Sequence, residues 1–271
     1  MTRIAVIGGG KIGEALISGL LHGGHSVRDL VVAEQYEPRA EDLATEYSIR
    51  VTTIADAAEG ADVIVVAVKP ADVDTVLTEL GKVDLDSDRE QLLVSLAAGI
   101  PTTRYEARLP AGFPVVRAMP NTPMLVGQGA GVITPGRHVK RGHLELVRSV
   151  LGTVGTVTTV PETMIDAATA VSGSGPAYFF LVVEAMIDAG VALGLTRATA
   201  SELVVQTMVG TAAMLTESGE SATELRAAVT SPGGTTAAAV RQLERGGLRT
   251  AFYDALTAAR DRSAELGVAP E

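Results

Sequence analysis

The stretch RIAVIGGGKIGEALISGLL, residues 3–21, is the most informative about the fold of this 271-residue chain. A short apolar run, rich in β-branched residues, leads directly into Gly8, Gly10 and Gly13, which have G-x-G-x-x-G spacing. The residues that follow have the periodicity of a helix. A strand, a glycine-rich turn and a helix in this order are typical of a dinucleotide-binding site, although the glycines alone would also suit a turn without a ligand.

The three glycines have different physical tasks in such a turn. Gly8 permits the tight turn, Gly10 lets a pyrophosphate approach the backbone, and Gly13 lets the helix pack closely on the strand. The N-terminus of the helix then faces the phosphates with its free amide groups. We therefore expect a dinucleotide to bind at this turn.

Short apolar runs continue up to about residue 160 and alternate with helical stretches. Runs of this length, separated by helices, are typical of parallel strands that are buried on both faces. Residues 1–161 are therefore predicted to form an α/β domain with a doubly wound, mainly parallel sheet. Its strands are expected in RIAVIG, DLVVAE, ADVIVVAV, QLLVSLA, FPVVRAM, AGVITP and GTVTTV.

The second half of the chain has a different pattern. After Pro161 the strand-like runs stop and alanine-rich stretches with helical spacing continue to the end, so residues 162–271 are predicted to be all helical. Helix starts are recognisable, for example the capping box SATE at residues 221–224. Many of these helices carry apolar residues on more than one face, which predicts that another subunit covers them.

Composition limits the classes of function. A hydrophobic content of 46% suits sizeable cores, and a formal net charge of -10 argues against nucleic acid or an anionic membrane surface as a partner. The chain has no cysteine, which fits a reducing cytoplasm and makes a metal site unexpected. Lys11 and Glu14 interrupt the apolar N-terminal run, and Glu184 and Asp188 interrupt the run at residues 178–195, so neither a secretory signal nor a membrane span is expected.

The end of the second predicted strand bears on the choice of cofactor. Glu34 lies where an acidic side chain can accept hydrogen bonds from the adenosine ribose, which favours NAD. Arg39 follows closely and could instead neutralise the 2′-phosphate of NADP. The sequence leaves this choice open, and a solvated loop position for Glu34 is a further alternative.

Two other strand ends are candidates for the ligand crevice, because ligands of open α/β sheets bind at the carboxyl ends of strands. These are AVKP at residues 67–70 and SLAAG at residues 95–99, although ordinary strand termination would also explain them. In AMPNTP, Asn121 is held between two prolines and could bind a polar group, or could simply belong to a structural turn.

The catalytic chemistry is limited by what the helical half lacks. The last lysine is Lys140 and the last histidine is His143, so the usual general bases of alcohol dehydrogenases are missing after residue 161. A protonated cyclic imine needs no such base, since it reaches the enzyme as a hydride acceptor. In SPGGTT, residues 231–236, free amides at a helix start would hold a carboxylate, and the threonine hydroxyls could contact a ring nitrogen; a capped helix start without a ligand is the alternative.

Taken together, six segments resemble pyrroline-5-carboxylate reductase over nearly the whole chain. They are VIGGGKIGEALISGL, VAVKP, SLAAGI, VRAMPNTP, AVSGSGPAY and ELRAAVTSPGGTT. The resemblance implies an N-terminal Rossmann domain and a helical dimerisation domain, with a homodimer that often assembles into a decamer. It also implies an oxidoreductase of proline biosynthesis, which reduces 1-pyrroline-5-carboxylate to proline with NADPH or NADH.

The resemblance also assigns roles to individual residues. Thr236 would face the ring nitrogen of the substrate, and the backbone of Ser231 to Thr235, with Gly233 and Gly234, would hold its carboxylate. Glu217 is a weaker candidate for a water-mediated contact. The segment SGSGPAY would form a helix break near this site, unless close packing alone explains its glycines. The cofactor would lie on Gly8, Gly10, Lys11, Ile12, Gly13, Ala67, Val68, Lys69, Pro70, Ala97, Ala98 and Asn121, with Glu34 departing from the commonest family pattern.

Two other functions stay open at this point. One is a reductase for a related imine or a β-hydroxyacid, and the missing lysine counts against the hydroxyacid. The other is a dinucleotide sensor without catalysis, for which a second anion-binding loop would have no purpose.

Overall fold

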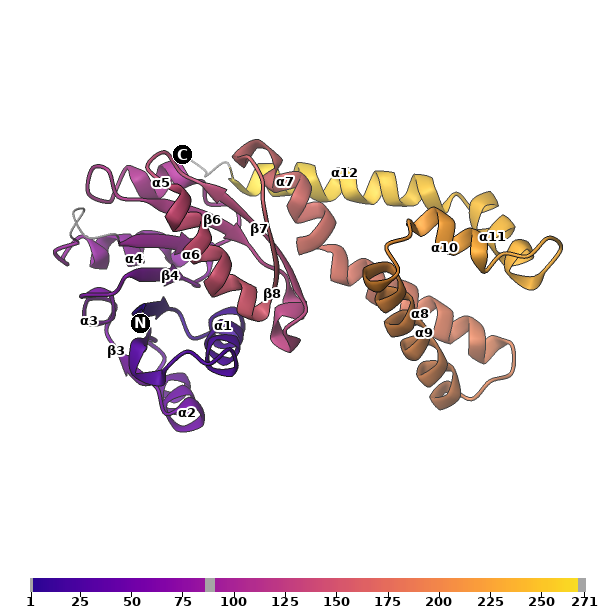
Figure 1. Ribbon diagram of the computed structural model, residues 1–271, viewed down its shortest axis with the longest axis horizontal. Helices are drawn as coiled ribbons and strands as arrows, with labels where there is room; N and C mark the ends of the chain where they lie inside the picture. Colours follow the sequence, from indigo (N-terminus) through magenta and orange to yellow (C-terminus); the bar gives the residue numbers. More distant parts are fainter. Residues whose placement is uncertain (1, 86–90, 268–271) are drawn as a thin grey trace. The chain divides into compact units, whose positions relative to one another are not determined.

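A computed structural model of the chain describes residues 2–85 and 91–267. By its internal contacts the chain divides into two compact units. The first contains residues 1–174 together with residues 259–271, and the second contains residues 175–258 (Figure 1).

The first unit is built on one eight-stranded sheet with the order β3-β2-β1-β4-β5-β6-β7-β8. Neighbouring strands are parallel except β6 and β7, which are antiparallel. The strand order reverses between β1 and β4, as in the doubly wound sheet that was predicted. The strands are β1 (Ile4–Ile7), β2 (Leu30–Ala33), β3 (Arg50–Thr52), β4 (Val63–Val66), β5 (Leu92–Ser95), β6 (Val115–Met119), β7 (Gly129–Pro135) and β8 (Gly155–Thr159).

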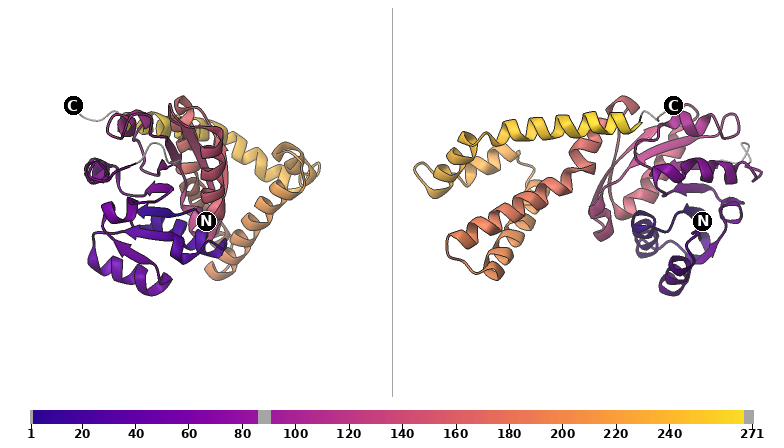
Figure 2. Two further views of the ribbon diagram at one scale, coloured as in Figure 1. Left: turned by 60° about the vertical axis from the view of Figure 1, so that its left-hand side comes forward. Right: turned by 180° about the vertical axis from the view of Figure 1, so that it is seen from behind.

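Helices cover both faces of this sheet, as the other views of the ribbon also show (Figure 2). Successive side chains of a strand point to opposite faces, so each strand contributes to two cores. Ile4 and Val6 of β1 pack with α1, α2 and α6, whereas Ala5 and Ile7 pack with α3, α4 and α5. These helices are α1 (Lys11–His22), α2 (Glu37–Tyr47), α3 (Ile54–Ala58), α4 (Val73–Leu80), α5 (Thr102–Glu106) and α6 (Arg141–Leu151).

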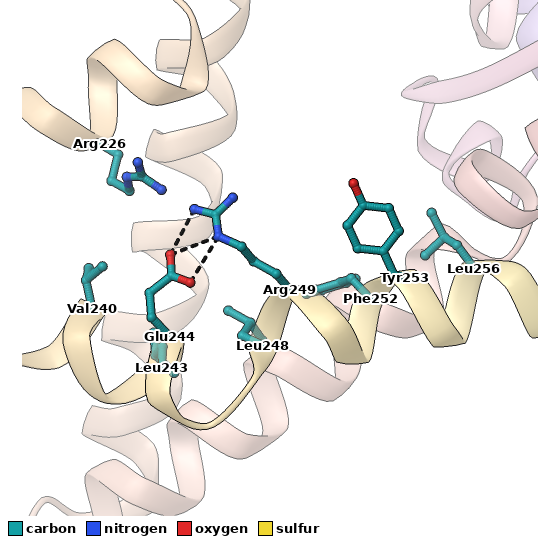
Figure 3. Close-up of a pocket in the computed structure, with 9 residues that line it drawn as sticks. All are labelled: Arg226, Val240, Leu243, Glu244, Leu248, Arg249, Phe252, Tyr253 and Leu256. Carbon is teal, nitrogen blue, oxygen red and sulfur yellow. Dashed lines mark hydrogen bonds and ion pairs between the residues drawn. The ribbon is translucent and has the colours of Figure 1, made fainter.

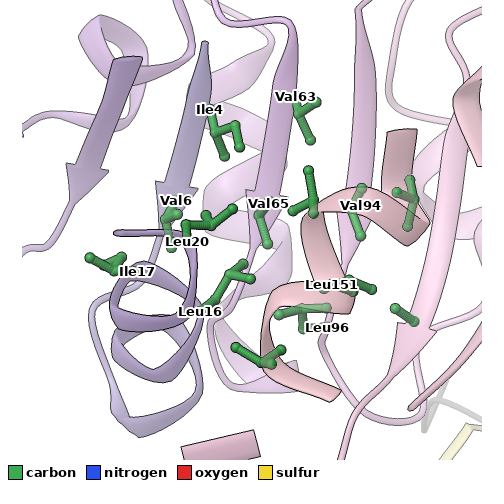
Figure 4. Packing of buried hydrophobic residues seen from close by; sticks show 14 of the residues in the cluster. Ile4, Val6, Leu16, Ile17, Leu20, Val63, Val65, Val94, Leu96 and Leu151 are labelled. Atoms are coloured by element: carbon green, nitrogen blue, oxygen red, sulfur yellow. The ribbon is translucent and has the colours of Figure 1, made fainter. Parts of the chain in front are cut away.

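The face covered by α1 shows why this first helix matters for the fold. Leu16 and Leu20 of α1 point toward Val6 and Val65 of the neighbouring strands, and all four side chains are at most 2% exposed (Figure 4). Burying a leucine in this way contributes about 2 kcal/mol. The helix is therefore held against the sheet along its whole inner face, and its N-terminus is fixed beside the end of β1.

A buried polar pair supports the opposite face. The Tyr105 hydroxyl in α5 lies 2.5 Å from Ser95 Oγ at the end of β5, and both residues are 0% exposed. Burial raises the pKa of Tyr105 to about 12, so its phenol stays neutral at physiological pH. The pair satisfies two hydroxyl groups that would otherwise be costly to bury.

Two features of the sheet differ from a simple reading of the sequence. The short edge strand β3 was not among the predicted strands, because Arg50–Thr52 has one apolar residue and is not fully buried. The pair β6 and β7 is antiparallel because a short connection, with the 3-10 helix η3 (Thr122–Val126), returns the chain directly alongside β6. The mainly parallel, doubly wound α/β fold itself is confirmed.

The second unit is helical, as predicted. It contains α8 (Gly175–Ala192), α9 (Arg197–Glu217), α10 (Ala222–Ala228), α11 (Thr235–Arg245) and the first part of α12 (Leu248–Gly267). Helices α8 and α9 lie side by side and approach closely where a Cβ on Gly190 would come 3.2 Å from Ala200 Cβ. The predicted capping box at Ser221 and Glu224 is present.

The helices of this second unit leave much apolar surface uncovered. Large side chains such as Phe179, Phe180 and Leu181 of α8 are 59–67% exposed. A groove of about 400 Å³ lies between α11 and α12, with Leu243, Leu248 and Phe252 in its apolar wall and the Glu244–Arg249 ion pair beside it (Figure 3). Surface of this extent is unusual for a monomer.

The helical stretch at residues 162–192 is long and apolar enough to cross a bilayer, with a mean hydropathy of 1.4. Only 11% of the apolar 18-residue part of this stretch is buried within the chain. Length and composition alone do not distinguish a membrane span from a helix that another subunit covers.

The contact-based units divide the chain later than the sequence-based boundary at residues 161 and 162. The short helix α7 (Ile165–Ala168) and the π-helical turn at Thr169–Gly173 pack on the first unit. The end of α12 does so too, since Ser263 Oγ donates a hydrogen bond to Asp166 Oδ1 at 2.7 Å. Contacts therefore continue past the point where the sequence pattern changes.

The packing of α1 predicts the cost of a cavity. Leu16→Ala should lower the free energy of unfolding by about 2–5 kcal/mol, because the sheet and helix cannot close completely around the lost side chain. Leu125→Ala is the control, since Leu125 is 50% exposed, and should change it by less than about 0.5 kcal/mol. Urea unfolding of both variants measures the difference. Equal effects at the two positions would contradict the packing described above.

Candidate functional site

The glycine turn between β1 and α1 has the geometry that its spacing predicts. Gly8 has a φ of +104°, and a Cβ there would come 2.8 Å from the Ala67 carbonyl oxygen. A Cβ on Gly13 would come 2.0 Å from the Gly8 carbonyl oxygen. Both positions therefore require glycine, one for the turn and one for the close approach of α1 to that turn.

Gly10 differs because space, rather than close packing, surrounds it. It is exposed, and a Cβ built on it meets nothing within 4 Å. It is also the N-cap of α1 and makes no side-chain capping hydrogen bond. The amide groups of the first turn are thus open to an anion, which fits the pyrophosphate of a dinucleotide.

A cavity of about 390 Å³ begins at this turn and runs along the ends of β1, β2 and β4. Six of the predicted cofactor residues line it, namely Gly8, Gly10, Glu34, Ala67, Val68 and Lys69. This is the carboxyl edge of the sheet, at the point where the strand order reverses, where ligands of such folds bind.

The other predicted cofactor residues lie outside the lining of this cavity. Lys11 is exposed at the start of α1, and Ile12 packs against the first core. Pro70 is exposed at the start of the 3-10 helix η2 (Pro70–Asp72). Ala97 is buried and Ala98 is exposed just after β5. Their contact with a cofactor stays a prediction.

Glu34 is held by the backbone on both sides of its carboxylate. Oε2 accepts a hydrogen bond from the Gly9 amide at 2.9 Å, and Oε1 accepts one from the Tyr36 amide at 2.8 Å. A carboxylate has about four acceptor sites, so both oxygens retain capacity for further donors. The Glu34 side chain is therefore fixed beside the glycine turn and is not a freely solvated loop side chain, while its contact with a cofactor stays a prediction.

Arg39 is bound to the same turn from α2. Its Nε donates to the Gly9 carbonyl at 2.8 Å, and its Nη2 lies 2.5 Å from Glu14 Oε2. Tyr47 donates to the other oxygen of Glu14 at 3.3 Å. Burial, followed by the nearby carboxylates, raises the pKa of Tyr47, so its phenol remains a donor. Gly9 is thus held at its amide by one side chain and at its carbonyl by another.

Asn121 connects two segments of the first unit. Its Oδ1 accepts from the Ala130 amide at 2.8 Å, and its Nδ2 donates to the Ser172 carbonyl at 2.9 Å. The residue is 8% exposed. The side chain thus links the AMPNTP loop to the π-helical turn, and its predicted contact with the cofactor stays a prediction.

The predicted helix break at SGSGPAY coincides with this π-helical turn and the start of α8. A Cβ on Gly173 would lie 3.1 Å from Met119 Cε and 3.3 Å from Thr169 Cγ2, so close packing favours a small residue at this position. Gly175 has no neighbour within 4 Å of a Cβ. Packing therefore explains part of this segment.

In the second unit, the loop before α11 leaves a helix N-terminus without a side-chain cap. Within residues 175–258, Thr196 caps α9 and Ser221 caps α10, whereas the N-cap of α11 is Gly234. Gly233 has a φ of +73°, and a Cβ on Gly234 would lie 2.5 Å from Ser231 Oγ. The loop thus selects glycines and keeps the first-turn amides of α11 available.

Three other predicted substrate residues lie at helix ends of the second unit. Thr235 and Thr236 are the first two residues of α11, the former exposed and the latter half-buried. Glu217 is exposed at the end of α9. Their contact with a substrate stays a prediction.

The cavity at the glycine turn is also lined by residues that were not predicted from the sequence. Ile54 follows the unpredicted strand β3, and Thr75 and Val76 come from α4. No motif marks these positions. Recognition of β3 as an edge strand would have placed Ile54 near the end of the neighbouring β2.

A doubly wound sheet whose first turn is open to a pyrophosphate is typical of dinucleotide-dependent oxidoreductases. In sequence, residues 3–99 match the family described as NADP oxidoreductase coenzyme F420-dependent, and residues 162–266 match Pyrroline-5-carboxylate reductase dimerisation. The chain belongs to the pyrroline-5-carboxylate reductase family and is an NAD(P)H-dependent oxidoreductase.

Individual relatives show how complete the similarity is. The chain is 53% identical to the pyrroline-5-carboxylate reductase of Mycobacterium tuberculosis, over 100% of this chain and 99% of that protein. A solved pyrroline-5-carboxylate reductase from Coxiella burnetii is 38% identical, with a TM-score of 0.94 and 99% of both chains covered. A Plasmodium falciparum pyrroline carboxylate reductase solved with NADP bound is 29% identical, with a TM-score of 0.85 and 98% of both chains covered.

The two kinds of glycine predict different defects. Gly10→Ala should leave the free energy of unfolding nearly unchanged but weaken NADH and NADPH binding about tenfold or more, because its methyl group occupies the approach to the helix N-terminus. Gly13→Ala should instead destabilise the fold by roughly 1–3 kcal/mol through steric overlap. Nicotinamide fluorescence and urea unfolding separate the effects. Unchanged cofactor affinity in the stable Gly10→Ala variant would contradict this assignment.

Proposed function

We propose that this chain reduces 1-pyrroline-5-carboxylate to L-proline by hydride transfer from NADPH or NADH, the last step of proline biosynthesis. The observation that carries the substrate assignment is the uncapped N-terminus of α11, because it offers backbone amides to a carboxylate. The similarity to family relatives extends over at least 99% of this chain and 99% of theirs, which supports the same activity.

The substrate carboxylate is held by the loop from Ser231 to Thr235, with Gly233 and Gly234 giving the backbone access. A helix N-terminus carries about half a positive charge, so it favours an anion without a lysine or arginine side chain. Glu217 is proposed for a water-mediated contact with the bound substrate. The loop fixes the orientation of the ring, and orientation is a large part of the rate enhancement in a two-substrate reaction.

The second role concerns the proton on the ring nitrogen. The sequence from residue 162 onward contains neither lysine nor histidine. The substrate binds as its protonated iminium form, so no side chain has to supply a proton at the moment of hydride transfer. We assign the Thr236 hydroxyl to the ring nitrogen, where it accepts a hydrogen bond from the N–H and supports the amine that forms.

NAD(P)H supplies the hydride when it is bound. The residues proposed to hold it are Gly8, Gly10, Lys11, Ile12, Gly13, Glu34, Ala67, Val68, Lys69, Pro70, Ala97, Ala98 and Asn121. The cavity at the glycine turn supports six of these positions directly. Ile54, Thr75 and Val76 are added to the site because they line the same cavity.

The helical half is proposed to form a homodimer, which can assemble into a decamer. The exposed side chains of α8 and α9 and the groove between α11 and α12 support an interface between copies of this chain. A partner subunit that covers α8 also explains why this helix is apolar although it does not cross a membrane. The protein is accordingly proposed to be cytoplasmic. The functional boundary is proposed at residues 161 and 162, and the family match that begins at residue 162 supports it.

Steady-state kinetics test the activity. Purified protein with 1-pyrroline-5-carboxylate and either reduced cofactor should oxidise the cofactor rapidly, as followed by the loss of nicotinamide absorbance. Turnover of a different cyclic imine but not of the pyrroline would move the assignment to a related reductase. Cofactor binding without turnover of any imine would instead support a dinucleotide sensor.

The role of Thr236 gives a separate prediction. Thr236→Ala should lower kcat by about 10²-fold, the low end of the effect of removing one preorganised hydrogen-bond partner, because the forming amine loses its hydroxyl partner. Thr236→Ser retains the hydroxyl and should keep kcat within a few-fold of the parent. If the alanine variant turns over normally, the hydroxyl has no part in the reaction.

A further inference from the structure

The backbone of Gly9 contacts two charged side chains that bear on the choice between NADH and NADPH. Its amide donates to Glu34 and its carbonyl accepts from Arg39, so the backbone of one residue positions a carboxylate and a guanidinium. A Cβ on Gly9 would lie 3.2 Å from Glu34 Oε2, which shows how closely this carboxylate approaches the turn. Glu34 also lines the cavity where the cofactor is proposed to bind.

Glu34 is suited to a ribose with free hydroxyl groups. Backbone donors fix both of its oxygens, and each oxygen keeps an acceptor site for a hydroxyl. A phosphate at the ribose 2′ position would instead bring an anion against this carboxylate. The repulsion cannot be relieved by rotating the side chain without loss of the two backbone hydrogen bonds.

Arg39 is the cation best placed to offset that repulsion, but Glu14 holds it. The Arg39 guanidinium uses Nη2 for Glu14 and Nε for the Gly9 carbonyl. The ion pair is only partly accessible, since the two side chains are 26% and 24% exposed. Tyr47 donates to Glu14 as well and helps to fix it. The guanidinium keeps further N–H donors, but a phosphate would have to share its positive charge with Glu14.

The sum of the three charges is also unfavourable to NADPH. Glu14 and Glu34 carry two negative charges and Arg39 carries one positive charge, which leaves a net negative cluster around Gly9. Lys69 is a further cation in the cavity, but it is exposed and follows β4 rather than β2. Arg39, which contacts the same residue as Glu34, is therefore already paired with Glu14.

We infer that this chain prefers NADH to NADPH, and that Glu14 is a specificity-determining residue because it withholds Arg39 from a 2′-phosphate. The inference rests on the proposed use of a dinucleotide at this turn. It assigns a role in cofactor choice to a side chain of α1 that acts through Arg39. Glu14 is thus a positioning residue, and Glu34 is the direct acceptor.

Binding of two adenosine fragments tests this inference without the reductase reaction. 5′-AMP and adenosine 2′,5′-bisphosphate differ only in the 2′-phosphate, and both can be measured by competition with bound NADH, using nicotinamide fluorescence. We expect the parent protein to bind 5′-AMP about tenfold or more tightly than the bisphosphate. In Glu14→Gln the affinity for the bisphosphate should rise about tenfold, whereas the affinity for 5′-AMP should stay unchanged.

Two further variants separate this role from a purely structural one. Glu145→Gln is the matched control, because Glu145 also pairs with an arginine on a helix, at 2.9 Å from Arg141 Nε on α6, and lies outside the cavity. It should leave the preference as it is. Adding Arg39→Gln to Glu14→Gln should remove the gain in bisphosphate affinity, because Arg39 is then no longer present to bind it.

The possible failures are distinguishable. Bisphosphate binding by the parent as tight as 5′-AMP binding would overturn the inference, and so would an equal change for both fragments in Glu14→Gln. No binding of NADH or either fragment would overturn it together with the cofactor site. The predicted fragment preference without any turnover of 1-pyrroline-5-carboxylate would leave the inference standing and contradict the proposed function alone.

Discussion

The close approach of Gly13 to the Gly8 carbonyl is the constraint on which the rest of the first unit depends. No side chain fits between the two, and this lets α1 begin directly beside the end of β1. The inner face of α1 then packs on the sheet, while its free amides remain at the edge where the strand order reverses. Fold and cofactor site therefore arise from one steric requirement, and a larger residue at position 13 would disturb both.

This acidic chain is proposed to bind two anionic molecules through its backbone. With a net charge of -10, attraction by the whole protein cannot draw in a dinucleotide or a carboxylate. The two proposed anion sites are instead helix N-termini with a glycine at the N-cap, Gly10 for α1 and Gly234 for α11. Backbone dipoles act at short range, so they provide local affinity without altering the overall charge.

The sequence predicted those features that follow from local sterics and periodicity. Gly8 and Gly13 could be assigned because only glycine allows the turn and the contact, and the buried strands because both faces demand apolar residues. The edge strand β3 could not, because Arg50–Thr52 is only partly buried and has little apolar pattern. The arrangement around Gly9 was also out of reach, since it joins side chains from α1, α2 and the end of β2. Glu34 and Arg39 were recognised as alternatives, but their simultaneous attachment to the backbone of one residue, Gly9, is a tertiary feature.

The bound cofactor is proposed to pass a hydride to the imine carbon of a pyrroline carboxylate. The most direct test is isotope transfer: the purified protein is incubated with 1-pyrroline-5-carboxylate and NADH or NADPH deuterated at the reactive nicotinamide position, and the product is analysed by mass spectrometry and NMR. We expect proline with a single deuterium at C5, the former imine carbon. Unlabelled proline, or no proline from folded protein that binds the cofactor, would contradict it.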